Sequence, residues 1–84
     1  MTNRFDKEEF DKVSLRILDR LTEAEVTFIL RGFSTKTRQT LIVGPALFTL
    51  KLRDQDRHQE AEEIYHEIVA DIKEKIKTEK SNET

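Results

Sequence analysis

The side chains that could hold a metal ion are two histidines and a glutamate spaced four residues apart, His58, Glu62 and His66. In a helix these side chains stack on one face, and a His/Glu pair at this spacing can share a metal ion. The first and the last lie about 12 Å apart along the helix axis, however, which is too far for a single ion. We expect a solvated charged face here, and neither a metal site nor a cofactor.

Groups suited to catalysis are also sparse. The paired carboxylates Glu8-Glu9 and Glu62-Glu63 fall on polar helix faces, where nothing apolar would raise the pKa of a carboxyl group. The only glycines are single and far apart, so there is no glycine-rich phosphate loop. Without cysteine there is no thiolate ligand and no disulfide. We expect a protein that is not an enzyme.

Charge is distributed unevenly along the 84 residues, whose formal net charge is −2. Residues 1–25 contain seven acids and five bases, and residues 54–84 contain ten acids and five bases. Residues 26–53 contain five bases and no acid. This basic middle predicts a patch that meets an acidic protein or nucleic acid. The patch is expected at Arg31, Lys36, Arg38 and Gln39.

The elements that must position these residues begin with two capping boxes. Asp6 with Glu9 opens a first helix, and Thr22 with Glu25 opens a second. Apolar residues recur at helical spacing after each box. The second helix is expected to end at Gly32 in a left-handed conformation.

A third helix can be capped by Ser34, and the apolar residues that follow point in nearly all directions. We therefore expect it to be the buried centre of the fold. Proline removes one backbone hydrogen bond and clashes with the preceding turn, so Gly44-Pro45 predicts a kink or a junction of two helices. A strand hairpin of residues 26–33 and 39–43 stays an open alternative, because both runs are rich in β-forming residues.

The last helix is expected over residues 57–77, where one apolar stripe recurs at helical spacing. At about 30 Å it is longer than the first two helices, so Ile72 and Ile76 at its far end are expected to stay uncovered. We predict a protein-binding patch there. It would comprise Ile72 and Ile76 with the rim Lys73, Lys75 and Lys77. The alternative is that the N-terminal segment around Phe5 folds over the two isoleucines.

Part of this region resembles one tetratricopeptide hairpin. The resemblance is carried by Leu50-Lys51-Leu52 and by the stretch 56–65, in which Ala61 is the small residue that lets two helices approach and Tyr65 the aromatic residue between them. It covers about twenty residues of one repeat, whereas such arrays need about three repeats. Asp56 stands near the place of the usual turn glycine. The resemblance implies an antiparallel hairpin between the third and last helices.

Together these patterns predict an all-α protein, a compact four-helix arrangement with a kinked central third helix and a long amphipathic C-terminal helix. Residues 1–80 would form a single helical domain, and residues 81–84 a frayed tail. The expected core is Phe10, Val13, Ile17, Leu21, Phe28, Ile29, Leu41, Leu47, Phe48, Ala61, Ile64, Tyr65 and Ile68.

The function expected from these features is that of a small cytoplasmic adaptor or inhibitor that binds another protein and also itself, as a homodimer. The polar N-terminus lacks the core of a signal peptide, and no apolar run is long enough for a bilayer, so no membrane partner is expected. The alternative is a DNA-binding regulator, because residues 23–43 have the outline of a helix-turn-helix. Phe28 and Arg38 depart from that motif, which needs a small and an apolar residue at their positions.

Overall fold

The computed structural model describes residues 7–82, which form helices joined by short turns, with no strand between these bounds. The elements are α1 Lys7–Leu18, α2 Glu23–Gly32, α3 Thr35–Arg38, η1 Gln39–Val43, α4 Gly44–Asp54 and α5 His58–Asn82. Elements α3, η1 and α4 follow one another without a break, so we call residues 35–54 the middle helix. The all-α, four-helix prediction is confirmed, and the alternative strand hairpin is wrong.

The beginning of α2 is the predicted capping box. The Glu25 amide donates to the Thr22 hydroxyl over 3.1 Å, and the Thr22 amide donates to the Glu25 carboxylate over 2.8 Å. The end of α2 differs from the expectation, because Gly32 is helical and has no positive φ. A Cβ atom at Gly32 would lie 3.0 Å from the Phe28 ring. A larger residue at position 32 would therefore require the Phe28 ring to shift by a few tenths of an ångström.

The middle helix begins at the predicted cap, where the Thr37 amide donates to the Ser34 hydroxyl over 3.1 Å. The irregularity expected at Gly44-Pro45 takes the form of a single π-helical turn, η1, in which the Gly44 amide donates to the Gln39 carbonyl five residues earlier. Proline has no amide proton for the ordinary bond to the carbonyl four residues back. The wider π-helical turn accommodates the missing hydrogen bond without ending the helix.

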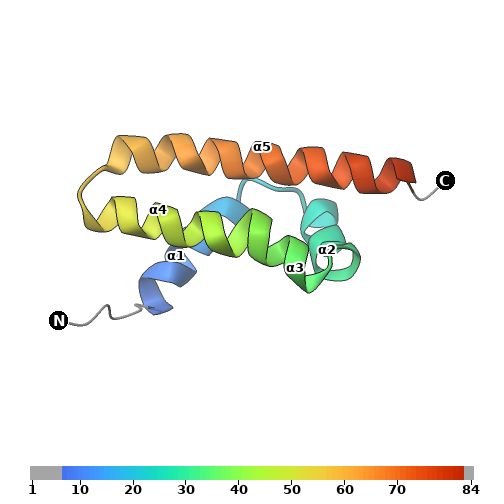
Figure 1. Ribbon diagram of the computed structural model, residues 1–84, viewed down its shortest axis with the longest axis horizontal. Coiled ribbons are helices and arrows are strands. Elements are labelled where there is room, and N and C mark those ends of the chain that lie inside the picture. The colour runs from blue at the N-terminus through green and yellow to red at the C-terminus, as the bar shows by residue number, and fades with distance from the viewer. Residues whose placement is uncertain (1–6, 83–84) are drawn as a thin grey trace.

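The middle helix and α5 form the antiparallel hairpin implied by the tetratricopeptide resemblance (Figure 1). The turn is a Schellman motif, in which the Asp56 amide donates to the Arg53 carbonyl and the Arg57 amide to the Leu52 carbonyl. Asp56 occupies the left-handed position with φ 59°. Both residues expected to close the hairpin, Ala61 and Tyr65, are buried.

Helix α5 is the longest element and is covered by different helices along its length. The α4 part of the middle helix and α1 lie against its first half, whereas α2 lies beneath its C-terminal half (Figure 1). The molecule is accordingly elongated, about 50 × 24 × 18 Å. The buried apolar cluster runs nearly the length of α5 and consists of Val13, Ile17, Leu21, Ile29, Phe33, Ala46, Tyr65, Ile68, Ile72 and Ile76.

Two expectations about burial are wrong. Ile72 and Ile76 are only 0% and 5% exposed, because α2 and the η1 turn extend along the end of α5 and cover them. Conversely, Leu47 and Phe48 were expected in the core but are 40% and 51% exposed. Only one side of the middle helix faces α1 and α5, so Leu47 and Phe48 on another side stay exposed.

Some expectations fall at the chain ends. The capping residue Asp6 and the segment around Phe5 lie outside the described residues. Helix α5 continues to Asn82 and so includes the first half of the tail expected at 81–84. The last two residues, 83–84, also lie outside the described part.

The burial of Ile72 predicts how two substitutions differ. Removing one methyl group from a tightly packed core residue costs about 0.5–1.5 kcal/mol, so Ile72→Val should lower the free energy of unfolding by that amount. Leu30 is 66% exposed, and Leu30→Ala should change it by less than about 0.5 kcal/mol. Urea unfolding followed by circular dichroism measures both. If the two variants were equally harmless, the packing of α2 over α5 would be wrong.

The left-handed turn residue gives a second prediction. Asp56→Gly should raise the free energy of unfolding by up to about 1 kcal/mol, because glycine adopts a positive φ without the steric cost that other residues have. Gln55→Gly is the matched control, since Gln55 has φ −94° and glycine there adds flexibility without relieving strain. Thermal unfolding should order them as Asp56→Gly, wild type, Gln55→Gly. The reverse order would contradict the turn geometry.

Candidate interaction surface

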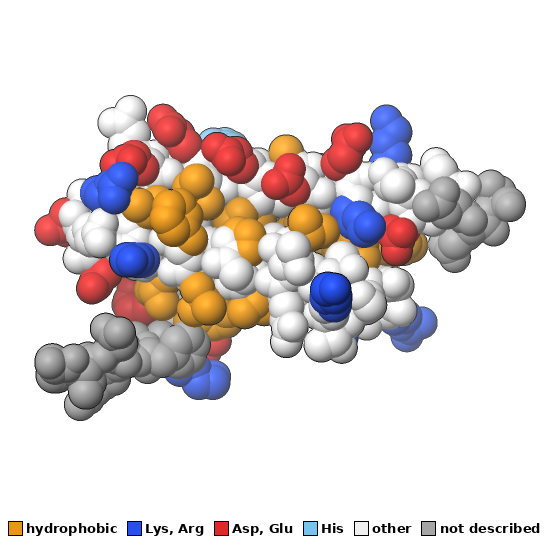
Figure 2. Space-filling view, in the orientation of Figure 1, with side chains coloured by type: hydrophobic (Ala, Val, Ile, Leu, Met, Phe, Trp, Pro, Cys, Tyr) orange, Lys and Arg blue, Asp and Glu red, His pale blue; other side chains and the backbone are white. Residues whose placement is uncertain are grey.

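Three large hydrophobic side chains of the middle helix are exposed: Val43, Leu47 and Phe48. We call these three residues the outer face. They are spaced four and one residues apart, and they are 37%, 40% and 51% exposed. The opposite side of the same helix carries Ala46 and Thr49, both fully buried. Figure 2 shows hydrophobic side chains over α4 that no other element covers. An exposed cluster of this kind is typical of a binding surface.

Sequence reasoning missed this surface because the middle helix is apolar nearly all round. A helix that is apolar on all sides is ordinarily surrounded by other helices. The 84 residues hold too few other helices to cover every side, and this count could have indicated an exposed face. The other exposed large hydrophobic residues are Leu15 on α1 and Leu30 on α2. Exposed apolar residues on separate elements are common and need no special explanation.

The predicted basic patch is only partly available to a partner. Arg31, Lys36 and Gln39 are exposed, as a binding role requires. Arg38 is instead used inside the fold, because its guanidinium donates to the Leu30 carbonyl over 3.1 Å. It thus satisfies a backbone carbonyl in the last turns of α2. Arg38 is therefore less available to a partner than the other residues of the predicted patch.

The helix-turn-helix outline is also altered by packing. Helix α2 and the middle helix are joined through Phe33 and Ser34, the residues at the adjoining caps. Phe33 is buried and meets Phe28 edge-on, with ring centroids 5.9 Å apart and an interplanar angle of 89°. Phe28, at the position where the motif needs a small residue, thus packs against Phe33 instead.

The lysines expected to rim Ile72 and Ile76 do not surround an apolar opening, since both isoleucines are buried. Lys73 lies 3.8 Å from the Glu25 carboxylate, and Lys75 lies 3.9 Å from that of Glu79. Lys77 is exposed. The predicted protein-binding patch at this end of α5 is therefore corrected to a covered, ion-paired region.

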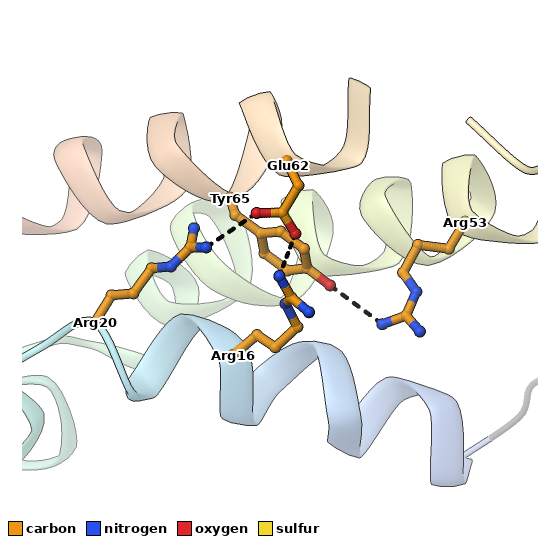
Figure 3. A network of polar contacts seen from close by, with 5 residues as sticks. All are labelled: Arg16, Arg20, Arg53, Glu62 and Tyr65. Carbon is orange, nitrogen blue, oxygen red and sulfur yellow. Dashed lines mark hydrogen bonds and ion pairs between the residues drawn. The ribbon is translucent and has the colours of Figure 1, made fainter. Parts of the chain in front are cut away.

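A network of polar contacts joins α1, α4 and α5 around Tyr65 (Figure 3). Arg16 on α1 and Arg20 in the turn after it reach the Glu62 carboxylate, and their guanidinium groups lie 4.9 Å and 5.4 Å from the centre of the Tyr65 ring. Arg53 reaches from α4, with its Nη1 atom 3.4 Å from the tyrosine oxygen. One aromatic ring and one carboxylate thus hold cations from two other helices.

A shallow hollow of about 180 Å³ adjoins this network and is lined by Arg16, Arg53, His58, Ala61, Glu62 and Tyr65. Its arginines already have acidic neighbours, because Glu62 contacts Arg16 and Arg20, and Glu9 lies 3.7 Å from Arg53. An anion entering the hollow would have to compete with these carboxylates. We regard the hollow as part of the contact between helices.

Two carboxyl groups in the described part of the chain have lowered pKa values. The pKa of Glu25 is lowered from its ordinary value chiefly by the hydrogen bond from the Thr22 amide. The Arg57 guanidinium, which donates two hydrogen bonds to Glu60, lowers the pKa of that carboxyl. Each shift follows from a contact at or beside the first turn of a helix, where carboxylates stabilise the helix.

No three potential ligands gather around a common point within residues 7–82, and the stacked residues His58, Glu62 and His66 form no such group. None of the helices in this range is long and apolar enough to cross a membrane.

No family model, no curated protein and no solved structure matches the chain. The local tetratricopeptide resemblance therefore stays a resemblance of one hairpin.

The network around Glu62 predicts a salt-dependent contribution to stability. Glu62→Gln should lower the free energy of unfolding by about 0.5–1 kcal/mol at low salt, because the carboxylate is partly exposed and neutralises two arginines. The loss should shrink in 1 M salt, where the screening length is about 3 Å. Glu63→Gln is the matched control on the exposed side of α5. Equal effects of the two substitutions at low salt would contradict the stabilising role of the Glu62 contacts with Arg16 and Arg20.

Proposed function

We propose that this chain is a non-enzymatic protein-binding module, an adaptor or inhibitor, whose docking surface is the outer face of the middle helix. The observation that carries the proposal is that Val43, Leu47 and Phe48 are large, exposed and adjacent on one helix. Aromatic side chains, Phe among them, are enriched in the buried cores of protein interfaces.

The apolar area of the outer face is too small to give tight binding by itself. Full burial of such a side chain stabilises by about 1.5–3 kcal/mol, so covering the exposed parts of all three contributes on the order of 2–4 kcal/mol. By itself that corresponds to a dissociation constant of roughly millimolar or weaker. A specific complex therefore requires polar contacts around the outer face.

DNA binding through Lys36, Arg38 and Gln39 has less support. Arg38 already donates to the Leu30 carbonyl, and releasing it would leave that carbonyl without this bond. Binding by the remaining residues stays a prediction, which titration with duplex DNA at low salt would test.

The proposed function predicts the result of site-specific photo-crosslinking in the native host. A benzophenone amino acid at position 48 should form a discrete adduct with one protein, because Phe48 would lie inside the interface. The same group at position 30 of α2, where the native leucine is 66% exposed against 51% for Phe48, should not form this adduct. Mass spectrometry identifies the products.

Two further substitutions make that experiment specific. Leu47→Glu, introduced beside the crosslinker, should abolish the adduct, whereas Leu30→Glu should leave it unchanged. An adduct with a second copy of this chain would support the docking surface and identify self-association. Identical adducts from positions 48 and 30, or none from position 48, would overturn the proposal.

A further inference from the structure

We infer that the occupant of the outer face is an amphipathic helix with acidic residues toward both of its ends, and not a second copy of this chain. The inference depends on the proposed function, because it names the kind of partner that the same surface would bind. It is carried by the charges around the outer face and by the absence of suitable apolar residues on α5.

The outer face lies in a part of the chain that contains no acid. Residues 26–53 contain only bases among their charged side chains. Lys36 precedes Val43 by seven residues and Lys51 follows Phe48 by three, so the two lysines lie beyond opposite ends of the apolar cluster. Both lysines are exposed. A partner that covers the cluster thus meets a positive charge near each end.

These lysines differ from most bases elsewhere in the molecule. Lys7, Lys12, Arg16, Arg20 and Arg53 each have an acidic group within 4.0 Å. Across residues 7–82 neither Lys36 nor Lys51 has such a neighbour, although acids are plentiful. Figure 2 shows a row of acidic side chains along α5. Charges left unpaired around an apolar surface favour a partner of opposite sign.

A second copy fits this surface poorly in a symmetric dimer and in a head-to-tail contact through α5. In a symmetric dimer the outer face would meet itself, which brings Lys36 and Lys51 of one copy toward the same lysines of the other. In a head-to-tail arrangement the acidic side of α5 would meet the outer face. Of the exposed large hydrophobic residues in the described part of the chain, none lies on α5, so that side cannot cover Phe48. Each arrangement thus lacks either complementary charge or apolar contact.

The spacing of the two lysines sets the size of the expected partner. They are separated by fifteen residues, which corresponds to about 22 Å of helix. A partner helix of roughly four turns spans that distance, with apolar residues at its centre and Asp or Glu near its ends. A helix laid along another helix presents such a stripe at i, i+3, i+4 and i+7.

The inference is tested with three synthetic helical peptides of eighteen residues that share one central Leu/Phe stripe. Their flanking residues are Glu in the first, Gln in the second and Lys in the third. We expect the acidic peptide to bind about three- to tenfold more tightly than the neutral one at low salt, and the basic peptide to bind most weakly. The preference should diminish in 1 M salt. Fluorescence anisotropy of labelled peptides measures the dissociation constants.

Matched variants connect the preference to the two lysines. Lys36→Gln combined with Lys51→Gln should remove the preference for the acidic peptide while leaving the affinity for the neutral one unchanged. Lys77→Gln, at an exposed lysine on α5, should leave the preference intact. Leu47→Glu should weaken the binding of all three peptides at least tenfold, and Leu30→Glu should not. Circular dichroism confirms that each variant is folded.

The possible failures are distinguishable. Equal binding of the three peptides that Leu47→Glu abolishes would overturn the acidic-partner inference and leave the docking surface standing. Sedimentation that finds a wild-type dimer disrupted by Leu47→Glu would likewise overturn the choice of a different partner. If no peptide bound at millimolar concentration and position 48 also gave no cellular adduct, the inference and the proposed function would both fail.

Discussion

The constraint on which this structure depends is the continuous apolar stripe of α5. The helix has 25 residues, so it is about 37 Å long and needs more cover than any one of the other helices supplies. The hairpin turn at Asp56 directs α4 back along its first half, and α1 joins there. Helix α2 then covers Ile72 and Ile76. Each of the other helices is therefore positioned by what it buries on α5.

Because the other helices pack along α5, one side of the middle helix is left uncovered. The side with Ala46 and Thr49 packs against α1 and α5. No other helix of the described chain is left to pack against its other side. The π-helical turn before Pro45 lets the helix continue instead of folding back over itself. Leu47 and Phe48 consequently have no helix to cover them. The exposed apolar surface is a by-product of covering α5 in so short a chain.

Charge follows the same geometry. Arg16, Arg20 and Arg53 converge on Glu62 and Tyr65, where they help to hold α1, α4 and α5 together. Lys36 and Lys51 lie on the middle helix, whose one acid is Asp54 at its C-terminal end. Within the described chain no acidic group lies within 4.0 Å of either lysine. The molecule thus presents an acidic α5 on one side and an apolar, basic helix on another, which is why we propose that its partner carries acidic residues.

The sequence by itself determined the local structure: the capping groups at Thr22 and Ser34, the irregular turn before Pro45 and the α4–α5 hairpin all follow from residue types at fixed spacing. Only the tertiary structure decided which faces are covered. Periodicity identifies an apolar face but not the helix that packs on it, so Ile72 appeared uncovered and Phe48 buried when the reverse holds. Arg38 likewise had a predictable charge but an unpredictable neighbour, because the Leu30 carbonyl reaches it only after two helices pack.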